Sequence, residues 1–147
     1  MYTENRGGQT IYIIPVVFHV VYNTTAQNIS DALCIAQLNQ LNLDFAKLNS
    51  DAGSTPALFS GVAANTNIQF CMAQRDPSGN ATTGIERRQT TVSSFSTNDA
   101  MKYFANGGLN AWPSNSYLNI WVCNMGGGIL GYAQFPGGAS ATDGVVL

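Results

Sequence analysis

Charged residues are scarce in this sequence. Lysine and arginine number 6 and aspartate and glutamate 8 among 147 residues, so the charged fraction is 10% and the net charge −2, against roughly 25% charged residues in typical globular chains. Proteins that bind nucleic acids or anionic membranes carry clustered Lys and Arg, and no such cluster occurs. We therefore expect neither a nucleic acid nor a membrane as partner. Asn, Gln, Ser, Thr and Gly replace the charges, as is common in secreted proteins, so we expect an extracellular location.

Long apolar runs are also missing. No run approaches the ~20 residues of a membrane-spanning helix. Met1 is followed by the polar residues 2–8 and not by the apolar segment of a signal peptide. We expect any secretion signal to lie outside this sequence. The length suits a single domain with a modest core.

Histidine and cysteine are too few for the common catalytic centres. His19 is the sole histidine, whereas a catalytic zinc takes three protein ligands. It lies inside an apolar run, so we interpret it as a core imidazole hydrogen-bonded across a sheet. The cysteines, Cys34, Cys71 and Cys123, lack CxxC spacing and lie in apolar runs. We expect buried free thiols, with one disulfide and a leftover thiol as the alternative. The residues alone indicate no catalytic centre.

The longest apolar run, Ile11 to Tyr22, predicts a central strand. It is apolar on both alternating faces, as in a strand covered on both sides. Pro15 is expected near the start of this strand, before the fully paired region. Pro136 removes an amide donor and so places the strand before it at an edge. Further strands are expected at Ile68–Ala73, Tyr117–Cys123, Leu130–Phe135 and Gly144–Leu147, and an extended polar piece at Gly84–Thr90.

One long helix is predicted from Ser30 to about Asn49. Ser30 is a good N-cap and Asp31 favours the positive helix end. An apolar stripe at helical spacing should cover one face of the sheet; it consists of Cys34, Leu38, Leu41, Phe45 and Leu48. A strand, an amphipathic helix and a further strand indicate a right-handed parallel crossover. A short helix is expected from Asn98 to Asn106, closed by the glycines that follow.

The ordered motifs resemble one family, the pappalysin family of metzincin zinc metalloendopeptidases, which includes ulilysin and the bacterial cytophagalysins. The resemblance covers nearly the whole chain after about Thr10, and the long block beginning at Tyr117 is its most specific part. The motifs are IPVVFHVVYNT (14–24), ISDALCIAQLNQLNLDF (29–45), IQFCMA (68–73), TTGIERRQT (82–90), YLNIWVCNMGGGILGYAQFPGG (117–138) and TDGVVL (142–147).

This resemblance implies an α/β (α+β) fold. The expected sheet is mostly parallel and twisted, with about five strands and one antiparallel edge strand, and with the long helix and the short helix packed on it. Residues 1–10 would form a flexible tail, and residues 11–147 the N-terminal (upper) subdomain of a metzincin catalytic domain, without its catalytic helix.

The resemblance also implies the activity of the whole protein. In the family the zinc motif HExxHxxGxxH follows the TDGVVL strand, and this sequence ends at Leu147, before it. The zinc-binding histidines and the general-base glutamate are therefore expected beyond Leu147, with Ca²⁺ also allowed there. The whole protein would be a secreted zinc endopeptidase acting on proteins and peptides, and this part alone would be inactive. No catalytic or metal-binding residue is expected within residues 1–147.

The family's antiparallel edge strand pairs with the substrate backbone. By position this role falls on four consecutive residues, Gly131, Tyr132, Ala133 and Gln134. The sequence ends in a strand with consecutive large aliphatics, so we also expect an exposed sheet face and self-association. The alternative is a stand-alone secreted binding or adhesion module that uses the same exposed edge strand. The sequence beyond Leu147 would distinguish the two.

Overall fold

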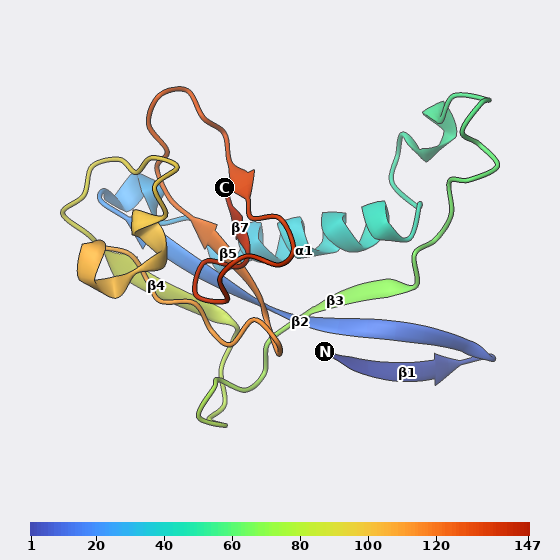
Figure 1. The fold of residues 1–147 in the computed structure, drawn as a ribbon, viewed down its shortest axis with the longest axis horizontal. Helices are drawn as coiled ribbons and strands as arrows, with labels where there is room; N and C mark the ends of the chain where they lie inside the picture. Colours follow the sequence, from blue (N-terminus) through green and yellow to red (C-terminus); the bar gives the residue numbers. More distant parts are fainter.

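A computed structural model describes residues 1–147 as one seven-stranded sheet with a single α-helix (Figure 1). The long β2 lies at its centre. The elements are β1 Tyr2–Arg6, β2 Gln9–Tyr22, α1 Asp31–Phe45, β3 Ile68–Met72, β4 Ile85–Gln89, β5 Leu118–Val122, β6 Tyr132–Ala133 and β7 Val145–Val146. The helix is not long and apolar enough to cross a membrane.

Strand β2 pairs with four neighbours because it is more than twice as long as most of them. On one side it pairs with β1 through residues 9–13 and with β5 through residues 16–20. On the other side it pairs with β3 through residues 12–16 and with β4 through residues 18–22. Pro15 lies in the gap between the β1 and β5 pairings, where a missing amide donor is tolerated. Pairing then continues from β5 to β7 and β6.

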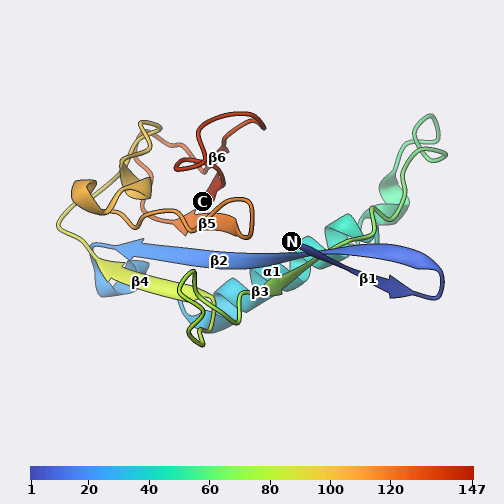
Figure 2. The ribbon, with the colours of Figure 1, turned by 60° about the horizontal axis from the view of Figure 1, so that its bottom comes forward.

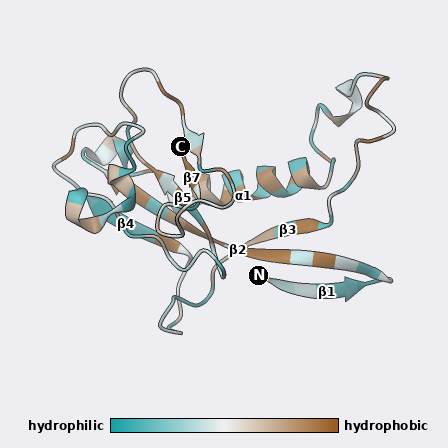
Figure 3. Cartoon of the chain, in the orientation of Figure 1, coloured by the Kyte–Doolittle hydropathy of each residue, from teal (hydrophilic) through white to brown (hydrophobic).

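The predicted fold class is confirmed. The pairings of β2 with β3, β4 and β5, and of β5 with β7, are parallel, and the edge strand β6 is antiparallel to β7. The sheet has seven strands and not about five, because β4 forms from the extended polar piece and β1 adds a second antiparallel edge. Residues 2–6, expected in a flexible tail, therefore lie in a strand paired with the start of β2, where a hydrophilic β1 flanks a hydrophobic β2 (Figure 3).

Alternation along β2 builds two core layers. Val16, Phe18 and Val20 face α1 and pack with Cys34 and Leu38. On the other face, Val17 packs with Trp112, and Val21 belongs to a cluster with Phe95, Met101 and Trp121. Figure 2 shows α1 along one side of the sheet and the segment between β4 and β5 on the other. The sequence pattern of a strand buried on both faces is thus confirmed.

The helices differ in detail from the prediction. Ser30 caps α1 as expected, its side chain accepting from the Leu33 amide. The helix ends at Phe45 because Lys47 adopts a left-handed conformation with φ 56°, so Leu48 leaves the apolar stripe and is 70% exposed. The predicted short helix is wrong: two 3-10 turns, Ala100–Lys102 and Phe104–Asn106, take its place because Tyr103 between them is extended.

Candidate functional site

The candidate site is the free side of β6 at the edge of the sheet. Only Tyr132 and Ala133 form the strand, which is shorter than the predicted Leu130–Phe135. Tyr132 lies opposite Val146 and Ala133 opposite Val145. No other strand pairs with β6 on its far side, so its outward backbone groups are available to a ligand.

Hydrogen bonds around β7 show which residues of β6 face outward. Leu147 donates its amide to the Trp121 carbonyl and accepts from the Cys123 amide, so its backbone faces β5. Gly144 instead accepts from the Gln134 amide at 3.3 Å and faces β6. Backbone groups alternate sides along a strand, so Val146 also faces β6 and Tyr132 points inward to it. The outward peptide groups are therefore those of Ala133 and of Gly131, two residues before it.

Gly131 lies very close to β7. A Cβ atom built on it would lie 2.4 Å from the Val146 carbonyl oxygen. Glycine is therefore required there by space, since real Cβ atoms do not approach backbone oxygens so closely.

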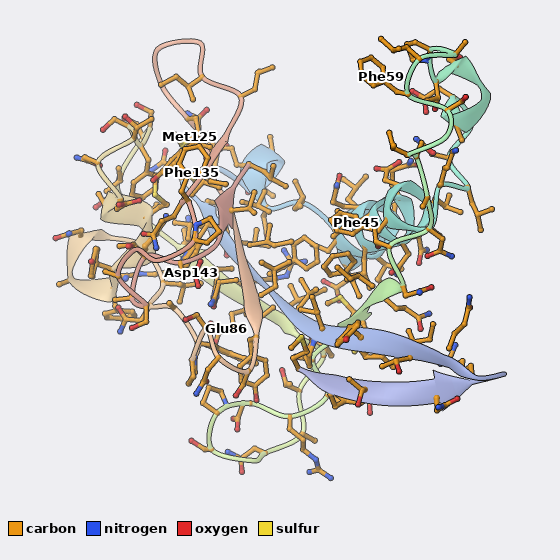
Figure 4. The ribbon with its side chains drawn as sticks, turned by 45° about the vertical axis from the view of Figure 1, so that its right-hand side comes forward. Phe45, Phe59, Glu86, Met125, Phe135 and Asp143 are labelled. Carbon is orange, nitrogen blue, oxygen red and sulfur yellow. The ribbon has the colours of Figure 1, made fainter.

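Side chains around β6 follow the same alternation. The Tyr132 ring is half-buried and packs on the cluster containing Trp121 and Met101. Ala133 is exposed, and so are the apolar residues flanking the strand, with Leu130 93% and Phe135 89% exposed. Figure 4 shows Phe135 and Met125 in the same part of the molecule. An extended peptide added to β6 would thus meet apolar side chains at both ends of the strand.

An apolar groove lies on the α1 face of the same end of the sheet. Its volume is about 520 Å³, and every lining residue except Gln37 is apolar. The lining comes from α1, β2, β3, β5 and β7 and from Leu147 just after β7, and it includes Phe45 and Ile120. An apolar groove thus lies open on this side of the sheet, between α1 and β7.

His19 has the structural role that the sequence predicted. It is fully buried, and its Nδ1 and Nε2 each lie 2.9 Å from an oxygen, Glu86 Oε2 and Asn119 Oδ1 respectively. The imidazole also stacks on Trp121 with ring centroids 5.0 Å apart. Asn119 Oδ1 also accepts from the Trp112 amide, and Asn119 Nδ2 donates to the Trp112 carbonyl. These contacts occupy both ring nitrogens in the core.

A zinc ion does not fit the residues present. No three His, Cys, Asp or Glu side chains converge in a group that could hold a metal, and His19 is engaged by Glu86 and Asn119. All three cysteines are free thiols, so the disulfide alternative is not realised. Burial raises the pKa of the Cys34 and Cys71 thiols and raises that of Cys123 to about 12. Thiols with raised pKa values are poor nucleophiles and poor metal ligands at neutral pH.

The sequence analysis missed Lys102, which lies directly behind the edge strand. Its side chain is fully buried, and its Nζ lies 2.9 Å from Asp99 Oδ1. Burial raises the pKa of the Tyr132 hydroxyl, which donates a hydrogen bond to the same carboxylate. A signal was present in the sequence, since Lys102 lies between Met101 and the aromatic pair Tyr103 and Phe104, three residues after Asp99.

Comparisons with known proteins place the chain beside solved peptidase structures. No protein-family model and no curated protein sequence matches it. Mature mirolysin of Tannerella forsythia, in complex with a cleaved peptide, is 51% identical over 95% of the chain with a TM-score of 0.90. Mirolysin in complex with a molecule named compound 9 is 52% identical over 93% of the chain with a TM-score of 0.88. A promirolysin variant of T. forsythia is 52% identical over 93% with a TM-score of 0.89.

The chain spans about half of each matched structure, 53% of mature mirolysin and 46% of promirolysin. At this identity and TM-score the chain resembles these structures in both sequence and fold. It confirms the family resemblance that the ordered motifs predicted.

Proposed function

The chain belongs with the N-terminal part of the pappalysin-like metzincins, and on this premise we propose that it is the upper subdomain of a secreted zinc-dependent metalloendopeptidase. Alone it should be inactive, because HExxHxxGxxH requires three histidines and His19 is the only one present. The zinc ligands and the general base would be supplied by the protein beyond Leu147, where the family also allows Ca²⁺.

One observation carries this proposal: the edge strand β6 has free outward backbone groups in a chain 51% identical to a peptidase crystallised with a cleaved peptide. An extended peptide can add to such an edge through main-chain hydrogen bonds. The outward groups of Gly131 and Ala133 would bind substrate backbone. Tyr132 and Gln134 would hold the strand to β7.

The apolar groove beside α1 supports a second proposed contact, with another part of the whole protein. Apolar grooves left open on a sheet normally mark an interaction surface. In the whole protein this surface would be covered by the part that supplies the zinc motif, and in the isolated chain it would promote self-association. The domain would then comprise the whole sheet, with β1 included, together with that covering part.

The test compares the whole protein with residues 1–147. We expect the whole protein to hold one zinc per chain and to cleave an unstructured protein substrate such as casein, with loss of cleavage on chelation and recovery on adding Zn²⁺. Residues 1–147 should retain far less than one zinc per chain after dialysis and should cleave nothing. If the natural reading frame stops at Leu147, or if the whole protein binds exposed peptides without hydrolysing them, the proposal is wrong and a binding module takes its place.

A further inference from the structure

A buried lysine lies directly behind the edge strand. The side chain of Lys102 has no exposed surface, and its Nζ donates to the Thr142 carbonyl at 2.7 Å. The same ammonium lies 2.9 Å from Asp99 Oδ1 and 4.9 Å from the centre of the Tyr132 ring. Burying an ammonium costs several kcal/mol unless its protons all find partners. Lys102 meets this condition only because Asp99, Tyr132 and Thr142 converge on it.

Tyr132 and Asp99 complete this arrangement from the strand side. The Tyr132 hydroxyl donates to Asp99 Oδ1 at 2.7 Å, so one carboxylate oxygen binds both the strand residue and the lysine. Asp99 precedes the 3-10 turn Ala100–Lys102 as its N-cap and holds a left-handed conformation, with φ 63°. We call these three residues the Asp99–Lys102–Tyr132 cluster.

The cluster also reaches the loop between β6 and β7. Thr142, whose carbonyl accepts from Lys102, hydrogen-bonds through its hydroxyl to the Gln134 side chain and the Ala139 carbonyl. Gln134 in turn donates to the Ala139 carbonyl at 3.1 Å. Lys102 is therefore connected to β6 through Tyr132 and to its return loop through Thr142.

Strand β6 needs such support because its backbone pairing is minimal. It contains two residues and pairs only with β7, which also contains two. Two-residue pairings are weak, since even a complete isolated hairpin is marginal in water. Glycines precede and follow the strand at Gly131 and Gly137. The position of β6 must therefore be fixed by side-chain contacts.

We infer that Asp99, Lys102 and Tyr132 are positioning residues that hold β6 where its outward peptide groups can bind an extended substrate. The inference rests on the proposed function, in which β6 binds substrate backbone. None of the three residues touches the substrate. Their effect on hydrolysis acts entirely through the placement of Gly131 and Ala133.

The test uses Tyr132→Phe in the whole protein, because this variant removes one hydroxyl and keeps the ring and the strand amide. The matched control is Tyr117→Phe, which removes a hydroxyl that donates to the Arg75 carbonyl at 3.0 Å, on a different part of the sheet. Each variant loses one hydrogen bond to an oxygen atom, and Tyr132→Phe also loses a contact of the hydroxyl with Met101 Sδ at 3.2 Å. General destabilisation should therefore be similar in the two.

Two peptides separate positioning from stability. For a peptide long enough to run along β6, we expect KM to rise about 2- to 10-fold in Tyr132→Phe, because the loss of one hydrogen bond weakens the placement of the strand. The kcat for this peptide should be nearly unchanged. A peptide too short to reach β6 should be cleaved as by the parent. Tyr117→Phe should match the parent on both. An equal change in KM in the two variants would overturn the inference. An equal loss of cleavage of the long and the short peptide by Tyr132→Phe would overturn it too.

Hydrogen exchange provides a readout that is independent of cleavage. The Gln134 amide donates to Gly144 across β6 and β7, and we expect it to exchange several-fold faster in Tyr132→Phe than in Tyr117→Phe. If the parent protein cleaves neither peptide, the proposed function fails, and exchange alone decides the role of the cluster. Equal exchange rates would then refute strand positioning as well.

Discussion

The backbones of Gly131 and Val146 lie so close together that any residue larger than glycine at position 131 must displace one of them. A Cβ atom on Gly131 would lie 2.4 Å from the Val146 carbonyl oxygen. We expect Gly131→Ala to lower the free energy of unfolding by about 1–3 kcal/mol, the usual cost of overpacking. Gly61→Ala is the control, because Gly61 has ordinary φ and open space around its Cβ position. Urea unfolding of both variants checks this, and a Gly131→Ala midpoint equal to that of Gly61→Ala would contradict it.

The assignment of inward and outward residues on β6 predicts opposite effects of two proline substitutions. Tyr132→Pro deletes an amide that faces Val146 and removes the buried ring, so it should lower the melting temperature markedly. Ala133→Pro deletes an outward amide and should leave the fold nearly intact. In the whole protein it should lower kcat/KM for long peptides by up to about tenfold, because the lost bond is worth roughly 0.5–1.5 kcal/mol.

Melting temperature and peptide hydrolysis, measured for each proline variant, decide between the assignments. A stable Tyr132→Pro together with an unfolded Ala133→Pro would reverse the register. Parental folding and cleavage in both would show that Gly131 to Gln134 do not bind substrate.

Local patterns in the sequence were sufficient to predict the main strands and the long helix. The continuous apolar run of β2 and the Ser30 cap of α1 both depend on neighbours within a few positions, so the sequence displays them directly. Strand β1 was missed because its residues, YTENR, are polar and show no buried face. It forms only through pairing with residues 9–13 of β2.

The parts of the site that the sequence did not reveal depend on distant contacts. Lys102 is buried by Thr142, 40 residues away, and by Tyr132, 30 residues away. Nothing local to Lys102 specifies those partners. The exposure of Leu48 was hidden for another reason, since it follows from a left-handed Lys47, a conformation that lysine rarely adopts. The substrate-binding role of the strand Gly131 to Gln134 remains a prediction, with Gly131 and Ala133 as the residues whose peptide groups face outward.

Asn119 should be among the most sensitive polar residues of the core. It is fully buried and satisfies three groups: His19 Nε2, the Trp112 amide and the Trp112 carbonyl. Asn119→Leu keeps the volume but leaves all three unpaired, at about 1–3 kcal/mol for each. We expect a loss of at least about 3 kcal/mol by urea unfolding. The control is Asn115→Leu, an exposed asparagine on the same segment; similar losses in both variants would refute a special role.

The apolar groove predicts self-association of residues 1–147. Leu147 lines the groove and is 39% exposed, so Leu147→Gln should weaken association about fivefold, corresponding to roughly 1 kcal/mol of lost apolar burial. Leu58→Gln is the control, since Leu58 is 84% exposed but lies on the connection that projects away from the sheet, near Phe59 (Figure 4). Sedimentation velocity over a concentration series measures both. A monomer at all concentrations, or a larger effect of Leu58→Gln, would contradict the groove as the interface.

Asp99 predicts a pH dependence of stability. Partial burial acts to raise the pKa of its carboxyl, but hydrogen bonds from Lys102 and Tyr132 and the lysine charge outweigh it, so the pKa is lowered overall. A folded-state pKa below the unfolded value means that the unfolded chain binds protons more readily. The stabilising contribution is therefore fully present above the unfolded value, about 3.9, and is lost as pH falls through the lower folded value.

Asp99→Asn should accordingly be less stable than the parent at pH 6, and this difference in unfolding free energy should shrink steadily below pH about 4. Asp51→Asn is the control, because Asp51 is exposed and its carboxylate accepts only from the Asn49 side chain; its difference from the parent should be small. Urea unfolding between pH 2 and pH 7, at concentrations where the chain is monomeric, measures both variants. A deficit of Asp99→Asn that grows on acidification would show that the carboxylate is not held ionised by Lys102 and Tyr132, and the link between that lysine and the edge strand would fail with it.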